Sequence, residues 1–321
     1  MKGIFCATAA VLALACGAAG AQQYPAKAIR VVVGFAPGGG TDLVARIIGA
    51  KMNESWGQPV LVDNRAGATG TIGADLVAKA PPDGYTLLMG HVNSHGIAPN
   101  IFRKLAYDAE RDFSMVAYVG YVPNVLVIHP SIPARNVKEL IAIAKAQPGA
   151  LNYASSGVGS TQHLAGELFT LLTGVKIVHV PYKGSGPAVV DLLAGHVSMN
   201  FDTMPPVLPH IKSGRMRALA LTTPKRSPQL PDVPTMMEVG LKGFDMTNWY
   251  GMMAPAKTPR DIVVKLNGEV NRIVRLPDAK AKLEEAGTQL DPMSPEQFAS
   301  FLKSEIAKYS KLVKAANVSL D

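Results

Sequence analysis

Two glycine-rich turns are the segments of this sequence best suited to hold a small anion. The first, residues 34–42 (GFAPGGGTD), lies between the β-branched run Ile29–Val33 and a segment with helical spacing of apolar residues, 43–52. It is therefore predicted to be a strand-to-helix turn, with Thr41 or Asp42 as the N-cap. Because its three consecutive glycines carry no side chains, backbone N–H groups and the positive end of the helix can converge on one acidic group.

The second turn, residues 155–163 (SSGVGSTQH), repeats this arrangement later in the chain. It follows a predicted strand at 151–154 and precedes a helix that is expected to start near Leu164. Gly157 and Gly159 allow the backbone to approach a ligand closely. Hydroxyl side chains around these glycines suit a carboxylate or a phosphate at a helix start. They are Ser155, Ser156, Ser160 and Thr161.

Neither turn matches a nucleotide-binding motif. The glycines of the first turn do not fit G-x-G-x-x-G, and no Lys-Ser/Thr pair follows them as a Walker A loop requires. For one such turn alone, a purely structural role is an equally good interpretation. The presence of a second turn of the same kind favours ligand binding.

An enzyme is the alternative interpretation, because Ser160, His163 and Asp202 could form a triad in a secreted α/β hydrolase-like protein. However, Ser160 and His163 are three residues apart at one helix start, and the segment GVGST lacks the closing glycine of G-x-S-x-G. His91 and His95 have the spacing of zinc ligands, but they lie in a predicted loop without an evident third ligand. We therefore expect no enzyme activity, no metal and no cofactor.

Predicted strands and helices alternate along the chain, which is typical of an α/β fold with parallel strands. Strands are expected at 29–33, 60–62, 85–89, 115–121, 125–129, 151–154, 176–180, 197–201, 217–222 and 249–254. Helices are expected at 43–52, 72–80, 137–146, 164–173, 188–194, 208–213, 262–275, 279–286 and 295–315. Ligands of open α/β sheets bind at the carboxyl ends of strands. A cleft between two halves would gather the four segments at strand ends, 34–42, 90–96, 155–163 and 181–186.

The first 21 residues have the features of a secretory signal peptide. Lys2 supplies a positive start, an apolar stretch at 4–15 follows, and Ala19-Gly20-Ala21 is a cleavage site. The mature chain would then begin at Gln22 and contain no cysteine, because Cys6 and Cys16 lie in the removed part. Lipidation of Cys16 is the competing interpretation.

Length and charge restrict the remaining possibilities. The chain has 321 residues, so the part after the leader is long enough for two domains with their own cores. The formal net charge is +8, but the basic residues are scattered and not interleaved with aromatic residues. We interpret them as a solvated surface and expect no binding to nucleic acid.

The mature chain resembles the TctC/Bug-type periplasmic solute-binding receptors of tripartite tricarboxylate transporters. The motifs that carry this resemblance occur in the family's order and spacing, and they cover essentially the whole mature chain. They are FAPGGGTD (35–42), VDNRAG (62–67), DGYTLL (83–88), GVGSTQHL (157–164), VPYKG (180–184), FD (201–202) and PDVPT (231–235). The segment HVNSH (91–95) departs from the Thr/Asn-like stretch of many relatives, which leaves the ligand undetermined.

The resemblance implies an α/β, two-lobed periplasmic-binding-protein fold of type II, with a mixed sheet flanked by helices in each lobe and the ligand cleft at the hinge. It places lobe 1 at 22–122 plus 224–321 and lobe 2 at 123–223. The implied ligand is a small carboxylate (dicarboxylate, tricarboxylate or aromatic acid) that a monomeric receptor delivers to membrane transporter subunits. The implied ligand-binding residues are Phe35, Gly39, Gly40, Thr41, Asp42, Asn93, Ser156, Gly157, Ser160, Thr161, His163, Lys183 and Asp202.

Individual roles within that set remain open at the level of sequence. Asp42 would repel an anionic ligand, so an N-cap or water-holding role is favoured for it. His163 can contact a ligand oxygen or pack at the helix start. Lys183 is the best candidate for direct neutralisation of a ligand charge, and a solvated surface lysine is the alternative.

Overall fold

A computed structural model describes residues 24–316 of the chain, with side chains up to residue 314. The predicted signal peptide, with Cys6 and Cys16, lies outside these residues. Within the described part, no helix combines the length and the hydropathy that crossing a membrane would require.

The described residues form one ten-stranded sheet, in which eight strands follow the order β2-β1-β3-β9-β4-β7-β5-β6 and the other two, β8 and β10, pair with β4. Their bounds are β1 Ile29–Val33, β2 Val60–Asn64, β3 Thr86–His91, β4 Phe113–Ile128, β5 Asn152–Ser155, β6 Val178–Pro181, β7 Met199–Thr203, β8 Arg217–Leu221, β9 Thr247–Pro255 and β10 Gln289–Leu290. The outer strands are parallel, as the alternating pattern predicts. Around β4, however, the pairs with β7, β8, β9 and β10 are antiparallel, so the sheet is mixed.

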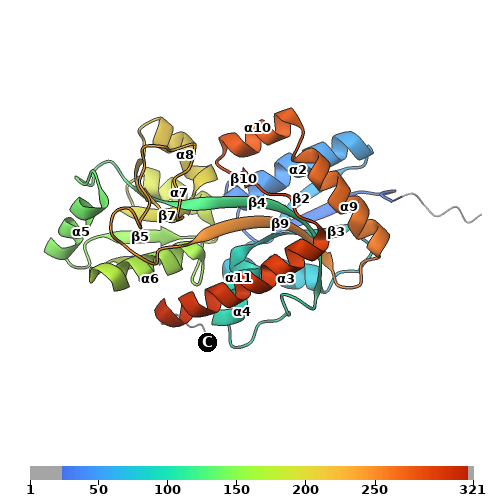
Figure 1. Ribbon diagram of the computed structural model, residues 1–321, viewed down its shortest axis with the longest axis horizontal. Helices are drawn as coiled ribbons and strands as arrows, with labels where there is room; N and C mark the ends of the chain where they lie inside the picture. Colours follow the sequence, from blue (N-terminus) through green and yellow to red (C-terminus); the bar gives the residue numbers. More distant parts are fainter. Residues whose placement is uncertain (1–23, 317–321) are drawn as a thin grey trace, which may run out of the picture.

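The long strand β4 links two sheet regions. Its residues 113–123 pair with β9, whereas its residues 124–128 pair with β7. We call β1, β2, β3, β9, β10 and the first part of β4 the first sheet region, and the remaining strands the second sheet region. Two separate strands were expected here, at 115–121 and 125–129; this prediction is wrong because the apolar run continues through Pro123 while the partner strand changes. Figure 1 shows β4 and β9 side by side along the long axis of the molecule.

Helices cover both faces of the sheet regions (Figure 1). They are α2 Gly40–Trp56, α3 Thr71–Ala78, α4 Ala98–Ile101, α5 Val137–Ala146, α6 Thr161–Thr173, α7 Ser185–Leu193, α8 Met204–Lys212, α9 Arg260–Ile273, α10 Pro277–Glu285 and α11 Pro295–Ala316, with short helical turns η1 Ala68–Gly70 and η2 Asn93–Ile97. The segment 90–96 was expected to be a loop. Instead β3 continues to His91 and η2 follows, so Asn93 is held on a helical turn.

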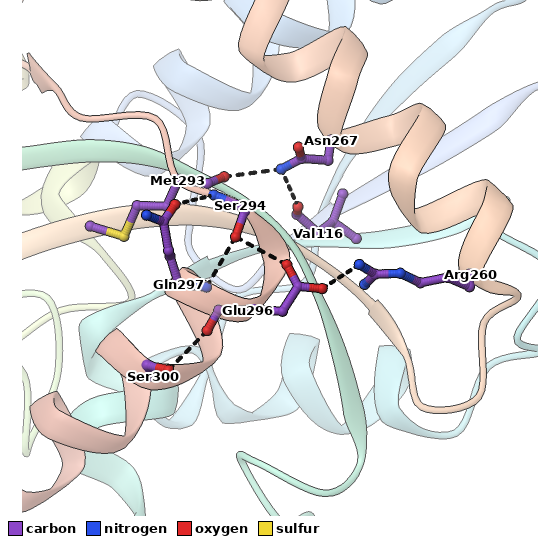
Figure 2. Close-up of polar contacts among 8 residues, drawn as sticks. All are labelled: Val116, Arg260, Asn267, Met293, Ser294, Glu296, Gln297 and Ser300. Atoms are coloured by element: carbon purple, nitrogen blue, oxygen red, sulfur yellow. Dashed lines mark hydrogen bonds and ion pairs between the residues drawn. The ribbon is translucent and has the colours of Figure 1, made fainter.

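Helices α9 and α11 pack against β4 in the first sheet region. Figure 2 shows that the Asn267 side-chain amide of α9 donates to the carbonyls of Val116, 2.8 Å, and Met293, 3.0 Å. Ser294 and Gln297 form a reciprocal capping box at the start of α11. The same helix packs against η2 and accepts a hydrogen bond from Asn100 at the Ile306 carbonyl. It therefore supports the turn that carries Asn93.

Candidate functional site

A small buried chamber lies between the two sheet regions, at the carboxyl ends of β1, β3, β5 and β7. Its volume is about 20 Å³, which is room for roughly one water molecule. All four strand-end segments singled out in the sequence contribute to it. The lining residues are Phe35, Gly39, Gly40, Thr41, His91, Asn93, Ser156, Gln162, Ser185, Thr203 and Tyr250.

Four helices begin at this chamber: α2 at Gly40, α6 at Thr161, α7 at Ser185, and α8, whose N-cap is Thr203. Each helix start carries about half a positive charge from the helix dipole. No lysine or arginine is found among the described residues that line the chamber. The positive potential of the site therefore comes from oriented backbone rather than from cationic side chains, an arrangement that suits an anion.

The start of α2 is open to a ligand. Its N-cap is Gly39, and no side chain caps the helix; the expectation that Thr41 or Asp42 would do so is wrong. The first N–H groups of the helix therefore lack an intrahelical partner. A side chain does not fit at Gly40, because a Cβ atom there would lie 2.2 Å from the Tyr250 hydroxyl oxygen.

Asp42 shapes the first turn instead of lining the chamber. Its carboxylate accepts hydrogen bonds from the Gly38 N–H group, 3.1 Å, and the Asn64 side chain, 3.0 Å, and pairs with Arg46 at 2.9 Å. Burial alone would raise its pKa, but these partners outweigh burial and lower it. The Arg46 and Asn64 contacts explain why Asp42 is drawn away from the cap position.

The start of α6 is satisfied by protein groups. The Ser160 hydroxyl caps the His163 N–H group at 3.2 Å, and the Asn93 side-chain oxygen accepts from the Thr161 N–H group at 3.1 Å. The His163 ring accepts from the Gly159 N–H group and stacks on His179 with ring centroids 4.2 Å apart. Ser160, Thr161 and His163 are thus buried within this turn and do not line the chamber.

Direct contacts hold the two sheet regions together around the chamber. The Ala36 N–H group donates to the Lys183 carbonyl at 3.0 Å, and the Asn93 amide donates to the Ser156 hydroxyl at 3.5 Å. A Cβ atom at Gly186 would meet the Pro37 carbonyl oxygen at 2.1 Å, so only glycine allows this approach. The two sheet regions therefore touch beside the chamber, through backbone at 36–37 and 183–186 and through side chains at Asn93 and Ser156.

A larger cavity of about 260 Å³ adjoins the chamber and shares Phe35 and Ser156 with it. Two of the expected ligand-binding residues, Gly157 and Lys183, lie here instead of in the chamber. The Lys183 side chain is exposed. The other lining residues are Gly67, Ala68, Thr69, Gly70, Phe102, Val158 and Tyr182.

His91 and Tyr250 line the chamber, although neither is among the ligand-binding residues expected from the sequence. The two side chains pack with ring centroids 5.6 Å apart. Burial, with a smaller contribution from His95, lowers the pKa of His91 to about 3, so the ring is neutral. The Tyr250 hydroxyl is buried without a well-formed hydrogen bond. Burial raises the pKa of Tyr250, and the nearby Thr203 side chain offsets only part of this rise. Within residues 24–316 no cluster of metal-binding side chains includes the two histidines.

The possible triad is not assembled. Asp202 is fully buried and bonds to Ser185, 2.5 Å, and to the Thr203 N–H group, 2.7 Å, not to His163. Burial raises the pKa of Asp202 to about 6. The sequence analysis did not select Gln162, Ser185 and Thr203 as binding residues, although all three line the chamber. Gln162 and Ser185 lie within two of the selected segments, and Thr203 follows Asp202.

Comparisons with known proteins show which family this chain matches. Residues 44–318 match the model of the TctC family, described as tripartite tricarboxylate transporter family receptor. The chain is 41% identical to Protein BugT of Bordetella pertussis, in a match that covers 99% of this chain and 97% of that protein.

Two similar solved structures hold ligands. Rpa4515 of Rhodopseudomonas palustris, solved with adipate, has a TM-score of 0.89 and 39% identity, covering 92% of this chain and 99% of that one. MatC of the same organism, solved with bound malate, has a TM-score of 0.84 and 36% identity, covering 90% and 100%. The likeness to periplasmic binding proteins confirms the predicted α/β fold of that class.

Proposed function

Because the chain belongs to the receptor family of the tripartite tricarboxylate transporters, we propose that it captures a small carboxylate in the chamber and delivers it to the membrane subunits of such a transporter. The family consists of solute-binding receptors, which makes hydrolase activity unnecessary to explain any part of the site. The observation that carries the proposal is the convergence of four helix starts on a buried chamber without lysine or arginine.

The ligand is expected to enter with one carboxylate toward α2. The uncapped N–H groups at the start of that helix are suitable donors for a carboxylate oxygen. In the form described here the chamber has room for about one water molecule, so the two sheet regions would stand slightly further apart around a bound carboxylate. The rest of the ligand would extend into the adjoining cavity. The adipate and malate complexes of the two relatives support a dicarboxylate, whose second acidic group would then approach Lys183.

Capture requires the two sheet regions to separate and close. We assign lobe 1 to residues 22–122 plus 224–321 and lobe 2 to residues 123–223, because β4 changes partners between Pro123 and Asn124. A ligand that bonds to both lobes has its highest affinity for the closed form, and this difference drives closure. In this proposal the receptor is a monomer in the periplasm, exported by cleavage after Ala21, and lipidation of Cys16 is the alternative anchor.

A thermal-shift screen tests the proposal. Purified protein, unfolded and refolded to remove any ligand acquired during expression, is heated with succinate, malate, adipate, citrate and benzoate, and with the corresponding amides. A ligand that binds only the folded state at a hundredfold excess over its Kd stabilises it by about 2.7 kcal/mol. We expect a higher Tm with at least one acid and none with its amide. Equal shifts with acids and amides, or no shift with any acid, would refute carboxylate capture.

A further inference from the structure

Asp202 is a buried carboxylate that lies one hydrogen bond behind the chamber. Its side chain has no exposed surface and does not line the cavity. It accepts hydrogen bonds from Ser185 at 2.5 Å, from Asn200 at 2.8 Å and from Gln162 at 3.4 Å, all of them neutral groups. Since an ionised carboxylate can only accept hydrogen bonds, these contacts fix the direction in which each partner's hydrogen points.

The hydroxyl groups of lobe 2 consequently turn their hydrogens away from the chamber. The Ser185 hydroxyl donates to Asp202 and accepts from the Gln162 amide at 3.2 Å. The Ser156 hydroxyl donates to the Gln162 carbonyl at 2.8 Å and accepts from Asn93. Each hydroxyl has one lone pair left, so the Ser156 and Ser185 side chains of lobe 2 offer hydrogen-bond acceptors to whatever occupies the chamber, beside the N–H groups at the starts of α7 and α8.

The wall formed by lobe 1 has the opposite character. It presents the uncapped N–H groups of α2 and the unpaired Tyr250 hydroxyl. The His91 Nδ1 atom accepts from the Asn93 N–H group at 3.1 Å, so the proton of the neutral ring resides on Nε2, which is a donor. A ligand group between the two walls therefore meets donors on one side and side-chain acceptors on the other.

We propose that Asp202 is a positioning residue that keeps the Ser185 hydroxyl turned away from the ligand, so that the receptor selects carboxylates with a hydrogen-bond donor on the neighbouring carbon. Such ligands are 2-hydroxy and 2-amino acids. Their carboxylate faces the donors of lobe 1, and their hydroxyl or ammonium group satisfies the acceptors of lobe 2. This inference rests on the proposed function, because it assumes that the chamber holds the carboxylate.

Calorimetric titration with matched acids tests the inference. Each set contains an unsubstituted acid, its 2-hydroxy form and its 2-amino form: succinate, malate and aspartate; propionate, lactate and alanine; 3-phenylpropionate, phenyllactate and phenylalanine. In the set that binds, we expect a substituted acid to bind about tenfold more tightly than the unsubstituted acid, as one additional hydrogen bond supplies. The hydroxy and amino arms show which donor the chamber takes.

Substitutions then link the preference to Asp202. In Asp202→Asn the new amide can donate to the Ser185 oxygen and release its hydroxyl hydrogen toward the ligand, so the preference should shrink to about twofold. Ser185→Ala should also lose the preference, because the acceptor is removed. Asp232→Asn, at an exposed position between β8 and β9 that lines neither cavity, is the matched control and should keep it. Melting curves show that each variant is folded.

The results distinguish the positioning role of Asp202 from the proposed function of the receptor. If the wild type binds an acid without preferring its substituted form, or if Asp202→Asn keeps a tenfold preference, the positioning role is refuted while the proposed function stands. If no acid of these sets binds the wild type but adipate, citrate or benzoate raises its Tm, the positioning role alone is refuted. If no acid binds in either experiment, both are refuted.

Discussion

The starts of helices α2 and α6 look alike in the sequence but differ in what satisfies their N–H groups. Both follow a strand and a glycine-rich turn. At α2 no side chain caps the helix, whereas at α6 Ser160 caps from within and Asn93 bonds from the opposite lobe. The first start is therefore available to a ligand, and the second is already occupied when the lobes are in contact.

This difference suits the two turns to different roles, one in binding the ligand and one in stabilising the closed form. In the proposed receptor, the first turn would hold a ligand oxygen, and the second would hold the closed form through Asn93. A helix start that finds its acceptor on the other lobe favours closure in the same way that an anion would. The four changes below test this division of roles, from the largest expected effect to the smallest.

Gly40→Ala should abolish ligand binding through the first turn. The added Cβ atom would lie 2.2 Å from the Tyr250 hydroxyl oxygen and 3.3 Å from Pro205, so it fills the space at the start of α2 and displaces the Tyr250 hydroxyl from the chamber wall. We expect at least a hundredfold loss of affinity, about 2.7 kcal/mol, by calorimetry. Gly268→Ala, on α9 with no atom near its Cβ position, is the control and should bind normally. Normal binding by Gly40→Ala would remove α2 from the site.

Asp202 should make stability depend on pH. Burial raises its pKa to about 6, so between its unfolded value, near 3.9, and pH 6 the folded protein binds more protons than the unfolded chain. The free energy of unfolding should therefore fall as pH rises through this window, by up to about 1.4 kcal/mol per pH unit. Tyr250, the titratable group facing Asp202, has a raised pKa and does not titrate there.

Urea unfolding between pH 4 and 7 measures this effect. The wild type should lose stability relative to Asp202→Asn as pH rises, and the difference should level off above about pH 6. A difference that is constant over the whole range would show that Asp202 titrates normally or not at all. The measurement also establishes whether the network behind Ser185 and Gln162 is charged at neutral pH.

Asn93→Ala should weaken binding through the second turn. It removes two hydrogen bonds between the lobes, to Thr161 and Ser156, and exposes an uncapped helix start in the closed form. We expect about a tenfold loss of affinity, mainly as faster dissociation in stopped-flow measurements. Asn136→Ala, which removes a cap of the same kind from α5 away from the site, should lower stability by about 1 kcal/mol and leave affinity unchanged. If both variants lose affinity equally, Asn93 has no special role in closure.

Lys183→Met should have the smallest effect. Lys183 is exposed at the larger cavity, so a charge contact there contributes roughly 0–1 kcal/mol to the free energy of binding. We expect adipate to bind two- to threefold more weakly and its monomethyl ester to be unaffected, with the difference disappearing at high salt. An equal loss for the diacid and the ester would mean that Lys183 acts by packing.

The sequence predicted the parts of the site that depend on local patterns. The strand ends at 155–163 and 181–186 lie together because β5 and β6 are parallel. The strand end at 34–42 faces them from the first sheet region, where β1 and β3 run in the opposite direction. The sequence could not predict the position of Asp42, which is set by Arg46 and Asn64, or of Tyr250, which arrives on a strand more than 200 residues after the first turn. The expected break between residues 121 and 125 failed for a related reason, because strand continuity depends on the partners of β4 and not on its own composition.

The contacts that close the chamber have a consequence for how such receptors diversify. The Ala36 N–H bond to the Lys183 carbonyl, and the approach of Gly186 to Pro37, involve main-chain atoms. Replacement of neighbouring side chains such as Phe102 or Val158 leaves these contacts intact. Under the proposed function, point mutations in the larger cavity would change the ligand, while the main-chain contacts that hold the two sheet regions together would stay the same.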